Sequence, residues 1–395
     1  MSRWQILDPQ VPGWTPQLDQ LWTRLDPTLG PLVPLHFVKS TFVNIGGRIA
    51  SDGSGGIGLL FPRGHSSGRR SYSLRLQSHY DPAALLALLA PDRVSIYRPA
   101  ELDQLTFQPD QMGQGGFEFG TPARDELAAM RALHHTIWGG PDDARYPDDL
   151  HSAELGPATS LVARREGQLV GFLLGFHRFE LPALAGLGLP YRLDLGVESQ
   201  VLAVDPAARR FGLAATLKRE QARRARAAGL DLIHWTTDPL QFANAALNFG
   251  RLRAVAGQLY RSYYPFQNNL NRVTASRLGI VWLLRSSRGR SGMSDSPRPA
   301  SRSLAHFPGL ARLNRGPEAL PDPGPAPHLA LEIPADWNAL QHDDLALASR
   351  WRALADDLLE ARLGFGPGRY VVGDVASEGD QRFVIAHRYE PGLLL

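Results

Sequence analysis

One segment of this 395-residue chain combines residue types at a spacing that suits phosphate binding. A strand-like run ends at Val204, the chain turns, and the pattern Arg209-x-x-Gly212-x-Ala214 opens a helix. The first amides of a helix lack intrahelical partners and lie at the positive end of its dipole. Glycine and alanine leave room for phosphate oxygens to approach these amides. The segment therefore predicts a pyrophosphate site, although small residues here would also permit close packing of the helix on a strand.

Three side chains near this segment are candidates for acid–base chemistry. Glu198 lies in the strand before the turn and is our first candidate for a general base; the alternative is a carboxylate at a strand end that faces water. His234 and Asp238 flank the end of the following strand and can line the same cleft. His234 alternates with apolar neighbours, which favours a packed core position over a catalytic one.

A run of alternating helices and strands over residues 118–285 must position these groups. Apolar spacing predicts a helix at 122–138, a hairpin of strands 159–164 and 168–176 joined at Glu166-Gly167, and a strand at 195–204. The remaining predicted elements, in the order helix, strand, helix, strand, strand, span 213–228, 230–236, 240–253, 255–263 and 279–284. This pattern indicates an α/β (α+β) fold with a central sheet.

The order of these elements, with the Gly212 loop directly after the fourth strand, resembles the GNAT acetyltransferase superfamily and its acyl-CoA signature (Arg/Gln)-x-x-Gly-x-(Gly/Ala). A closer resemblance links the chain to a bacterial subgroup of predicted GNAT acyltransferases connected with N-acylamino acid metabolism. It covers about residues 120–390, and the segments that carry it are Trp235–Leu240, Asn244-Ala245, Asn248, Tyr260, Asn271, Trp337-Asn338 and Trp351-Arg352. The resemblance implies a GNAT-like mixed central sheet flanked by helices.

The resemblance implies direct acyl transfer from a CoA thioester to an amine, with acetyl-CoA or another acyl-CoA as co-substrate and no metal. In the family, a bulge in the fourth strand presents amides to the thioester carbonyl, here those of Val201–Val204. The amides of 210–214 would hold the pyrophosphate, and the pantetheine would lie between Leu202–Val204 and the end of 233–236. The predicted cofactor-binding residues are Leu202, Ala203, Val204, Arg209, Arg210, Phe211, Gly212, Leu213, Ala214 and Asn244.

Two departures from the family pattern concern proton transfer. Many relatives have a tyrosine in the helix after the fifth strand that protonates the leaving thiolate, and Phe249 stands about there. Tyr260, Tyr263 or Tyr264 could substitute, or be core aromatics, and the thiolate can also leave unaided. Gln200 stands where the subgroup has a histidine, so it cannot perform that residue's proton chemistry. The predicted catalytic set is Glu198, Tyr260 and Asp238.

The acceptor is predicted to be a small amine, with an amino acid as the leading candidate and an acetyl or succinyl donor. Recognition of a carboxylate would need a cation. Five arginines lie in segments that could border the cleft, each with a solvated surface position as the alternative: Arg178, Arg192, Arg251, Arg253 and Arg261. The rival interpretation is an acyl-CoA-binding sensor or partner protein with weak or no turnover.

Composition shifts divide the chain into four regions. Residues 1–117 predict a small α+β region, in which 40–45 fits a strand and 82–89 a short helix, with a degenerate GNAT-like half as one interpretation. Residues 118–285 predict the acyltransferase core. Residues 286–327, rich in Ser, Arg, Gly and Pro, predict a flexible linker. Residues 328–395 predict a strand–helix–strand–strand region. The flanking regions could close the acceptor site or form a homodimer interface.

The overall composition excludes several classes. The chain has no cysteine, which removes disulfides and thiolate chemistry. Its formal net charge is +3, and only Lys39 and Lys218 are lysines among 42 basic residues. Nucleic-acid binding by the 285–302 arginine cluster is therefore a minor alternative. No apolar run has the length of a signal peptide or membrane span, so we expect a cytoplasmic protein without membrane contact.

Overall fold

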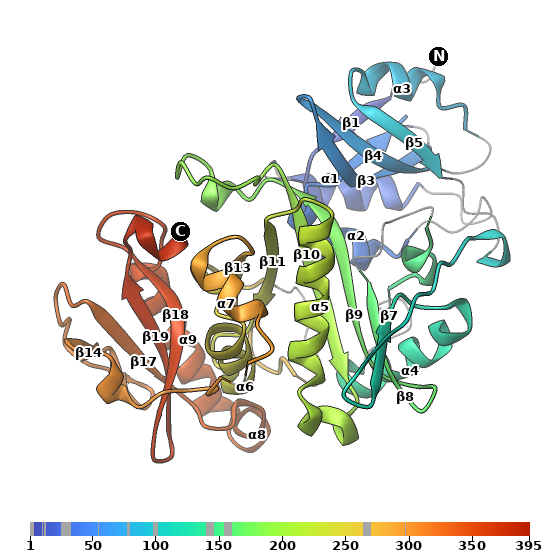
Figure 1. Ribbon diagram of the computed structural model, residues 1–395. Helices are drawn as coiled ribbons and strands as arrows, with labels where there is room; N and C mark the ends of the chain where they lie inside the picture. The colour runs from blue at the N-terminus through green and yellow to red at the C-terminus, as the bar shows by residue number, and fades with distance from the viewer. Residues whose placement is uncertain are drawn as a thin grey trace. The chain divides into compact units, whose positions relative to one another are not determined.

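The computed structural model describes residues 4–9, 11, 13–24, 33–53, 55–76, 80–97, 102–139, 146–153, 160–263, 270–296 and 298–395. Contacts divide the chain into two compact units (Figure 1). The first comprises residues 1–180 and 193–221, and the second comprises residues 181–192 and 222–395.

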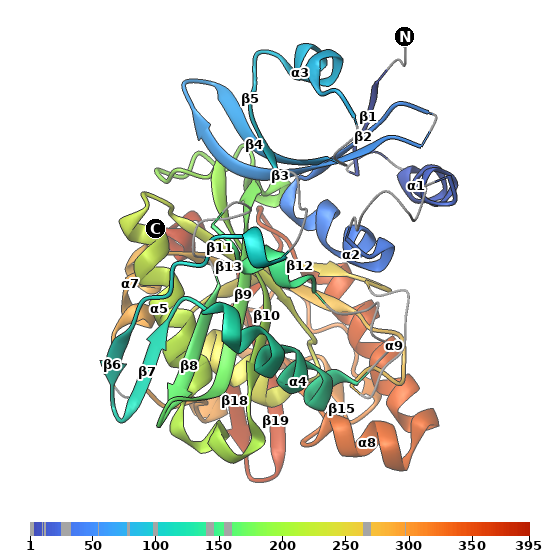
Figure 2. The same cartoon turned by 90° about the vertical axis from the view of Figure 1, so that its right-hand side faces the viewer.

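The N-terminal part of the first unit is a sheet with the strand order β1-β2-β3-β4-β5. Figures 1 and 2 show α1 and α2 on one side of this sheet and α3 on the other. The bounds are β1 (Gln5–Leu7), α1 (Trp14–Trp22), α2 (Leu35–Ile45), β2 (Arg48–Ser51), β3 (Ile57–Ser66), β4 (Arg69–Leu76), α3 (Ala83–Leu89) and β5 (Arg93–Tyr97). β4 and β5 pair in parallel because α3 supplies the crossover between them.

One prediction in this region is wrong. Residues 40–45 were expected to form a strand, but they belong to α2. Val38, Phe42 and Ile45 are fully buried, and their spacing follows the helical period of 3.6 rather than the period of 2 of a half-buried strand. Gly46, at φ 69°, ends the helix in the left-handed conformation. The predicted helix at 82–89 is confirmed as α3.

The rest of the first unit is an antiparallel sheet with the order β10-β9-β8-β7-β6. The predicted hairpin is confirmed, since Glu166 and Gly167, at φ 53° and 76°, join β8 to β9 in a tight turn. The bounds are η2 (Leu102–Gln104), β6 (Met112–Gln114), β7 (Phe117–Gly120), η3 (Arg124–Glu126), α4 (Leu127–Trp138), η5 (Asp148–His151), β8 (Leu161–Arg165), β9 (Gln168–Phe179), β10 (Leu195–Val204), η7 (Pro206–Phe211) and α5 (Leu213–Ala227).

Two hydrophobic cores lie on the two faces of this sheet. The first joins Val201 and Ala203 of β10 with Phe176 of β9, the helices α1, α2 and α4, and the N-terminal sheet. The second joins Leu173 of β9 with Leu217 on the buried stripe of α5. Alternate residues of a strand point to opposite faces, which is why neighbouring residues of β9 enter different cores.

The second unit contains a sheet with the order β14-β17-β19-β18-β12-β13-β11, antiparallel except for β14 with β17. β15 and β16 pair separately. The bounds are η6 (Pro182–Leu184), β11 (Leu232–Thr237), α6 (Phe242–Ala245), the π-helix η8 (Ala246–Arg251), β12 (Val255–Tyr260), β13 (Arg277–Leu283), α7 (Ser287–Met293), η9 (Leu304–His306), β14 (Leu310–Arg312), β15 (Asn314–Arg315), β16 (Glu318–Ala319), β17 (His328–Ile333), α8 (Trp337–Asp343), α9 (Leu345–Arg362), β18 (Tyr370–Glu378), β19 (Gln381–Arg388) and η10 (Pro391–Leu394).

The stretch 286–327 differs from the flexible linker that the sequence predicted. It contains α7, η9 and the short strands β14, β15 and β16. Ser286 caps α7 by accepting a hydrogen bond from the Gly289 amide. The Arg302 amide donates to the Val375 carbonyl at 3.1 Å, and the Ser377 amide donates to the Arg302 carbonyl at 2.9 Å. Hydrogen bonds to β18, far along the chain, therefore order a stretch that has no periodicity of its own.

Among the helices that the structure describes, none has both the length and the apolar character needed to cross a bilayer.

Candidate active site

β10 contains the bulge that the resemblance implied for the fourth strand. Glu198 lies opposite Phe176 and Val201 lies opposite Leu174, so Ser199 and Gln200 together face the single residue Gly175. A bulge interrupts the hydrogen-bond ladder and re-aims the local backbone groups. It lies directly before Val201, where the thioester-binding amides are predicted to begin.

Glu198 is buried in an ion pair with Arg178. Its side chain is 1% exposed, and Arg178 Nη1 lies 2.6 Å from Glu198 Oε2. The alternative of a carboxylate that faces water is therefore wrong. Arg178, on β9, is one of the five arginines considered as binders of a substrate carboxylate. In this structure its guanidinium pairs with Glu198. An ion pair at this depth needs both partners, because either one alone would be an uncompensated buried charge.

Lys218 of α5 lies beside this ion pair and was not among the predicted site residues. Its amine donates a hydrogen bond to Ser199 Oγ at 2.9 Å, and the residue is buried. Burial lowers the pKa of Lys218 to about 7, although the Glu198 carboxylate opposes this shift. One sequence signal could have revealed it: this is one of only two lysines in an arginine-rich chain, and it follows Leu217 on the buried stripe of the helix.

The predicted phosphate-binding helix start has the required backbone geometry. Gly212 adopts φ 72°, which favours glycine, and a Cβ added there would meet nothing within 4 Å. The Ala215 and Thr216 amides donate to the Gly212 carbonyl at 3.0 and 3.2 Å. The amides of Leu213 and Ala214 precede these first helical bonds, so helix geometry gives them no intrahelical partner.

The remaining predicted cofactor residues of the first unit fall into two groups. Arg209, Arg210 and Phe211 are exposed at the loop before α5. Phe211 packs against Phe117 with ring centroids 5.4 Å apart, and the Arg165 guanidinium lies over its ring. The others lie in or beside the sheet and helix: Ala203, Val204 and Leu213 are buried, while Leu202 and Ala214 are half-buried.

Asp238 lies in the second unit and is engaged by the surrounding structure. It is buried, with Arg352 Nη2 at 2.5 Å and Arg277 Nη1 at 3.6 Å from its Oδ2 atom. Its Oδ1 atom accepts a hydrogen bond from the Leu240 amide at 2.8 Å. This geometry holds the turn after β11 and leaves the catalytic role of Asp238 a prediction.

Tyr260 is half-buried at the end of β12, and its hydroxyl donates to Gln258 Oε1 at 2.7 Å. A Cβ added at Gly279 would come within 2.9 Å of the Tyr260 ring and 3.3 Å of His234 Nε2. The ring and the imidazole therefore both lie against Gly279. The second unit therefore has a tyrosine hydroxyl that could donate a proton, and the role of Tyr260 as a general acid stays a prediction. Tyr264 lies outside the described residues.

Asn244 and Phe249 follow in the next helical segment. Asn244 is exposed in α6, whereas Phe249 is fully buried in the π-helix η8. Of the other arginines considered for the acceptor, Arg253 pairs with Asp374, and Arg261 pairs with Asp357 and Glu360. Across the described ranges, no group of three or more His, Asp or Glu side chains could hold a metal ion.

Residues 127–249 match the family model described as the acetyltransferase (GNAT) family. This span runs from α4 to η8 and includes the β10 bulge and the Gly212 helix start. The matched segment has the GNAT fold within a mixed α/β structure, as the resemblance implied. A search of curated proteins gave no match. The narrower bacterial subgroup stays a prediction.

Solved N-acetyltransferase structures are similar to part of the chain. NAA60 of Arabidopsis thaliana in complex with acetyl-CoA is 15% identical, with a TM-score of 0.35, over 42% of this chain and 99% of its own. Ard1 of Thermoplasma volcanium is 15% identical, with a TM-score of 0.32, over 43% and 98%. The ribosomal-protein-S18-alanine N-acetyltransferase of Escherichia coli is 13% identical, with a TM-score of 0.31, over 42% and 92%.

Proposed function

We propose that this protein is an acyl-CoA-dependent N-acyltransferase that transfers an acetyl or succinyl group to a small amine such as an amino acid. One observation carries the proposal: the bulge at Ser199-Gln200 and the left-handed Gly212 helix start stand in succession within the segment that matches the GNAT family. The first supplies amides for a carbonyl oxygen that gains charge, and the second supplies amides for phosphates.

In the proposed reaction, the amine nitrogen attacks the thioester carbon, the C–S bond breaks and the CoA thiolate leaves. The attacking nitrogen must lose a proton as the amide forms. Lys218, whose pKa is about 7, accepts this proton through the Ser199 hydroxyl. Glu198 stabilises the ammonium that results, and Arg178 holds Glu198 in place. Tyr260 is proposed as the proton donor to the thiolate. Asp238 is proposed as a further member of the catalytic set.

Binding is tested by calorimetric titration of acetyl-CoA and succinyl-CoA. The variant Arg209→Glu/Ala214→Glu places two carboxylates at the helix start and is expected to weaken binding at least ~10-fold. Arg226→Glu/Ala227→Glu, at two exposed positions at the other end of α5, is the matched control and should bind like the wild type. Equal binding by both variants would remove the phosphate site from the proposal.

Turnover is tested by free-thiol release when pooled L- and D-amino acids are added. Release only when an amine is present would support transfer and identify the donor. Binding without release would instead support the second candidate function, an acyl-CoA sensor without turnover. Phe249 favours that candidate, because a fully buried phenylalanine without a hydroxyl stands where many relatives have the proton-donating tyrosine.

A further inference from the structure

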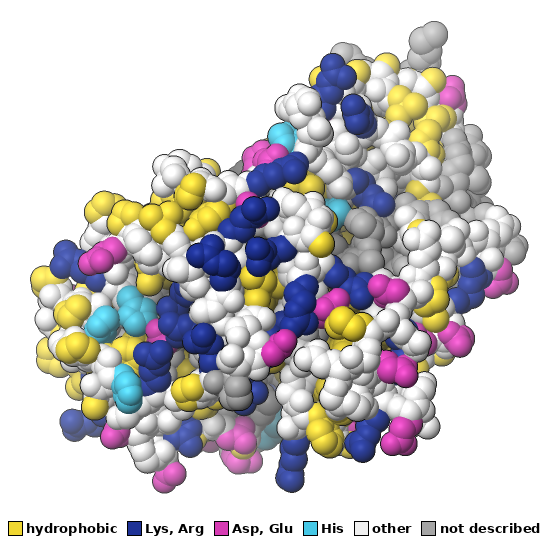
Figure 3. Space-filling view, viewed as in Figure 1, with side chains coloured by type: hydrophobic (Ala, Val, Ile, Leu, Met, Phe, Trp, Pro, Cys, Tyr) yellow, Lys and Arg dark blue, Asp and Glu magenta, His cyan; other side chains and the backbone are white. Residues whose placement is uncertain are grey.

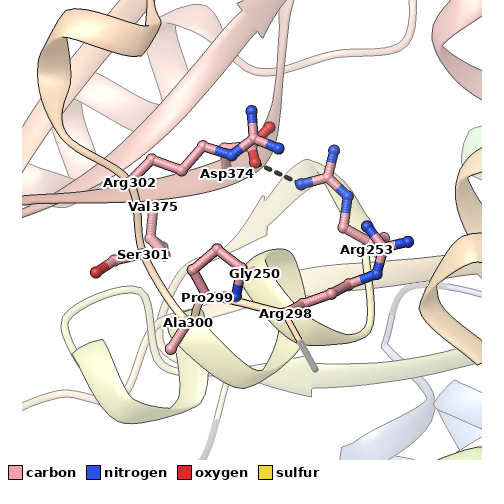
Figure 4. Close-up of a pocket in the computed structure, with 9 residues that line it drawn as sticks. All are labelled: Gly250, Arg253, Arg298, Pro299, Ala300, Ser301, Arg302, Asp374 and Val375. Carbon is pink, nitrogen blue, oxygen red and sulfur yellow. Dashed lines mark hydrogen bonds and ion pairs between the residues drawn. The ribbon is translucent and has the colours of Figure 1, made fainter. Parts of the chain in front are cut away.

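The second unit contains a small hollow, open to solvent, that the proposed reaction does not use. The end of η8, the stretch 298–302 and β18 line it (Figure 4). Three of its lining residues are arginines, Arg253, Arg298 and Arg302, and one is an acid, Asp374. Figure 3 shows basic and histidine side chains gathered near α7 and β18, where this pocket lies.

The single carboxylate of the pocket is already fully engaged. Asp374 accepts from Arg253 Nη1 at 2.5 Å and lies 3.0 Å from His387 Nε2 and 3.6 Å from Arg288 Nη2. Burial acts to raise the pKa of Asp374, but the hydrogen bond with His387 and the charges of Arg288 and Arg253 outweigh it and hold the pKa below its usual range. Asp374 is therefore ionised, and its charge is shared among cations that surround it.

Arg298 and Arg302 remain without a counter-charge. Within the part of the chain that the structure describes, neither forms an ion pair, and the buried Nε of Arg298 has no hydrogen-bond partner. A buried donor without an acceptor is costly, and an arginine cannot escape the cost by losing its proton. The pocket therefore has donors and positive charge in excess of what its own residues can satisfy.

The wall that carries these two arginines is held in place by the fold. A Cβ added at Gly250 would lie 2.1 Å from the Ala300 carbonyl oxygen, so only glycine allows the stretch to approach η8 this closely. Ser301 Oγ lies 2.9 Å from Ser377 Oγ. The amide and the carbonyl of Arg302 both form hydrogen bonds with the backbone of β18. The arginines are thus presented from a fixed backbone instead of a solvated linker.

We propose that this arginine pocket, formed by Arg253, Arg298 and Arg302 around Asp374, binds a small oxyanion, either a phosphate group or a carboxylate. Guanidinium groups bind both by paired N–H donors, and the charge excess favours an anion over a neutral ligand. Because the hollow is open to solvent, the anion can be free or at the end of a larger molecule. This site is independent of acyl transfer, so it would persist if the proposed function failed.

The test is calorimetric titration of inorganic phosphate into the full-length protein at fixed ionic strength, with chloride as the balancing anion. The wild type should bind one phosphate per chain, and Arg298→Met/Arg302→Met should bind it at least ~10-fold more weakly. Arg315→Met/Arg350→Met, which removes two exposed arginines elsewhere in the unit, should bind as the wild type does. A circular dichroism melt of each variant establishes that it is folded.

Further titrations distinguish the sources of the anion. Acetate and succinate test the carboxylate class. CoA and dephospho-CoA, each titrated into the wild type and into Arg298→Met/Arg302→Met, test whether a larger molecule carries the phosphate, because binding at the Gly212 helix start is the same in both proteins. Failure of phosphate and carboxylates alike to bind the wild type would overturn the proposal, and so would equal binding by the two double variants. Binding that rises without saturation would also overturn it, because this would indicate general charge screening in place of a site.

Discussion

Two of the buried clusters of charged groups, one in each unit, differ in their cations. In the first unit, Glu198 forms an ion pair with Arg178, and Lys218 donates a hydrogen bond to Ser199, the residue after Glu198. In the second unit, Asp374 is surrounded by arginines and His387. A lysine loses its charge readily when it is desolvated, whereas an arginine keeps its charge at every physiological pH. The first cluster is therefore suited to transfer a proton, and the second to hold an anion.

The pKa values in the two clusters follow this difference. Burial lowers the pKa of Lys218 to about 7, so its charge is lost within the physiological range. Burial also lowers the pKa of Arg288, helped by the charge of Arg253, but only to about 10, so this guanidinium stays protonated at neutral pH. The same physical cause thus produces a titratable group in one unit and a permanent cation in the other.

The largest effect is expected for Asp374→Asn, which removes the only carboxylate among the cations of the pocket. The free energy of unfolding should fall by about 3–5 kcal/mol, because the buried arginines lose their counter-charge and cannot deprotonate. Urea unfolding measures it. Added phosphate should restore part of the loss in Asp374→Asn, and a loss below ~1 kcal/mol would show that these charges are better solvated than the structure indicates.

A smaller loss is expected for Arg178→Met, about 1–3 kcal/mol, because Lys218 can keep its proton and compensate Glu198. The pKa of Lys218 should rise in this variant. With two lysines in the chain, ¹³C-lysine labelling gives a titration curve for Lys218 beside that of Lys39 as an internal reference. An unchanged Lys218 titration curve would show that the pKa of Lys218 does not depend on the Glu198–Arg178 ion pair.

The third prediction concerns pH. Between pH 7 and 10 the unfolded chain binds a proton at Lys218 that the folded chain has lost, so the free energy of unfolding rises with pH, by at most ~1.4 kcal/mol per unit. Below pH 7 both states are protonated, and the full cost of burying the charge remains. Lys218→Met should remove this slope. Urea unfolding of both proteins at pH 7.5, 8.5 and 9.5 measures the difference, and parallel curves would contradict it.

Lys218→Met also tests whether the charged cluster of the first unit transfers a proton during catalysis. The rate of acyl transfer by the wild type should rise as pH increases through about 7, where Lys218 becomes able to accept a proton. Lys218→Met should lose this limb, while its affinity for acyl-CoA stays unchanged because the Gly212 helix start is intact. A merely structural role would lower the rate equally at every pH.

The smallest effect is expected for Arg302→Met. This exposed side chain has no ion pair among the described residues, so its removal should change stability by less than about 0.5 kcal/mol, with a slight gain at low salt. The measurement is urea unfolding at 20 mM and at 500 mM salt. A large loss at both salt concentrations would indicate that Arg302 supports the fold and is not held ready for an anion.

Local signals in the sequence predicted the features that depend on neighbouring residues. The Glu166-Gly167 hairpin and the Gly212 loop needed only turn chemistry and left-handed conformations. The run at 40–45 was misassigned because a short apolar run fits strand and helix alike, and its helical partner Val38 lies just outside the run.

Contacts between distant residues explain what the sequence did not reveal. Lys218 reaches Ser199 across a strand, a turn and a helix, and no local pattern records that meeting. Arg302 is ordered by Val375, 73 residues later, so the composition of its own stretch indicated a linker. The family resemblance located the bulge and the helix start, but it could not reveal side chains whose roles arise from this chain's own packing.

The core shared by β10 and the N-terminal region determines how much of the chain the segment that matches the family needs in order to stay folded. The family match begins at residue 127, yet Phe37 and Phe61 pack against Phe176 inside the matched domain, with ring centroids 5.8 and 6.4 Å apart. The segment that matches the family and the segment that forms the shared hydrophobic core thus have different boundaries. A shortened protein that begins at residue 118 would expose this aromatic surface to water, so we expect it to aggregate.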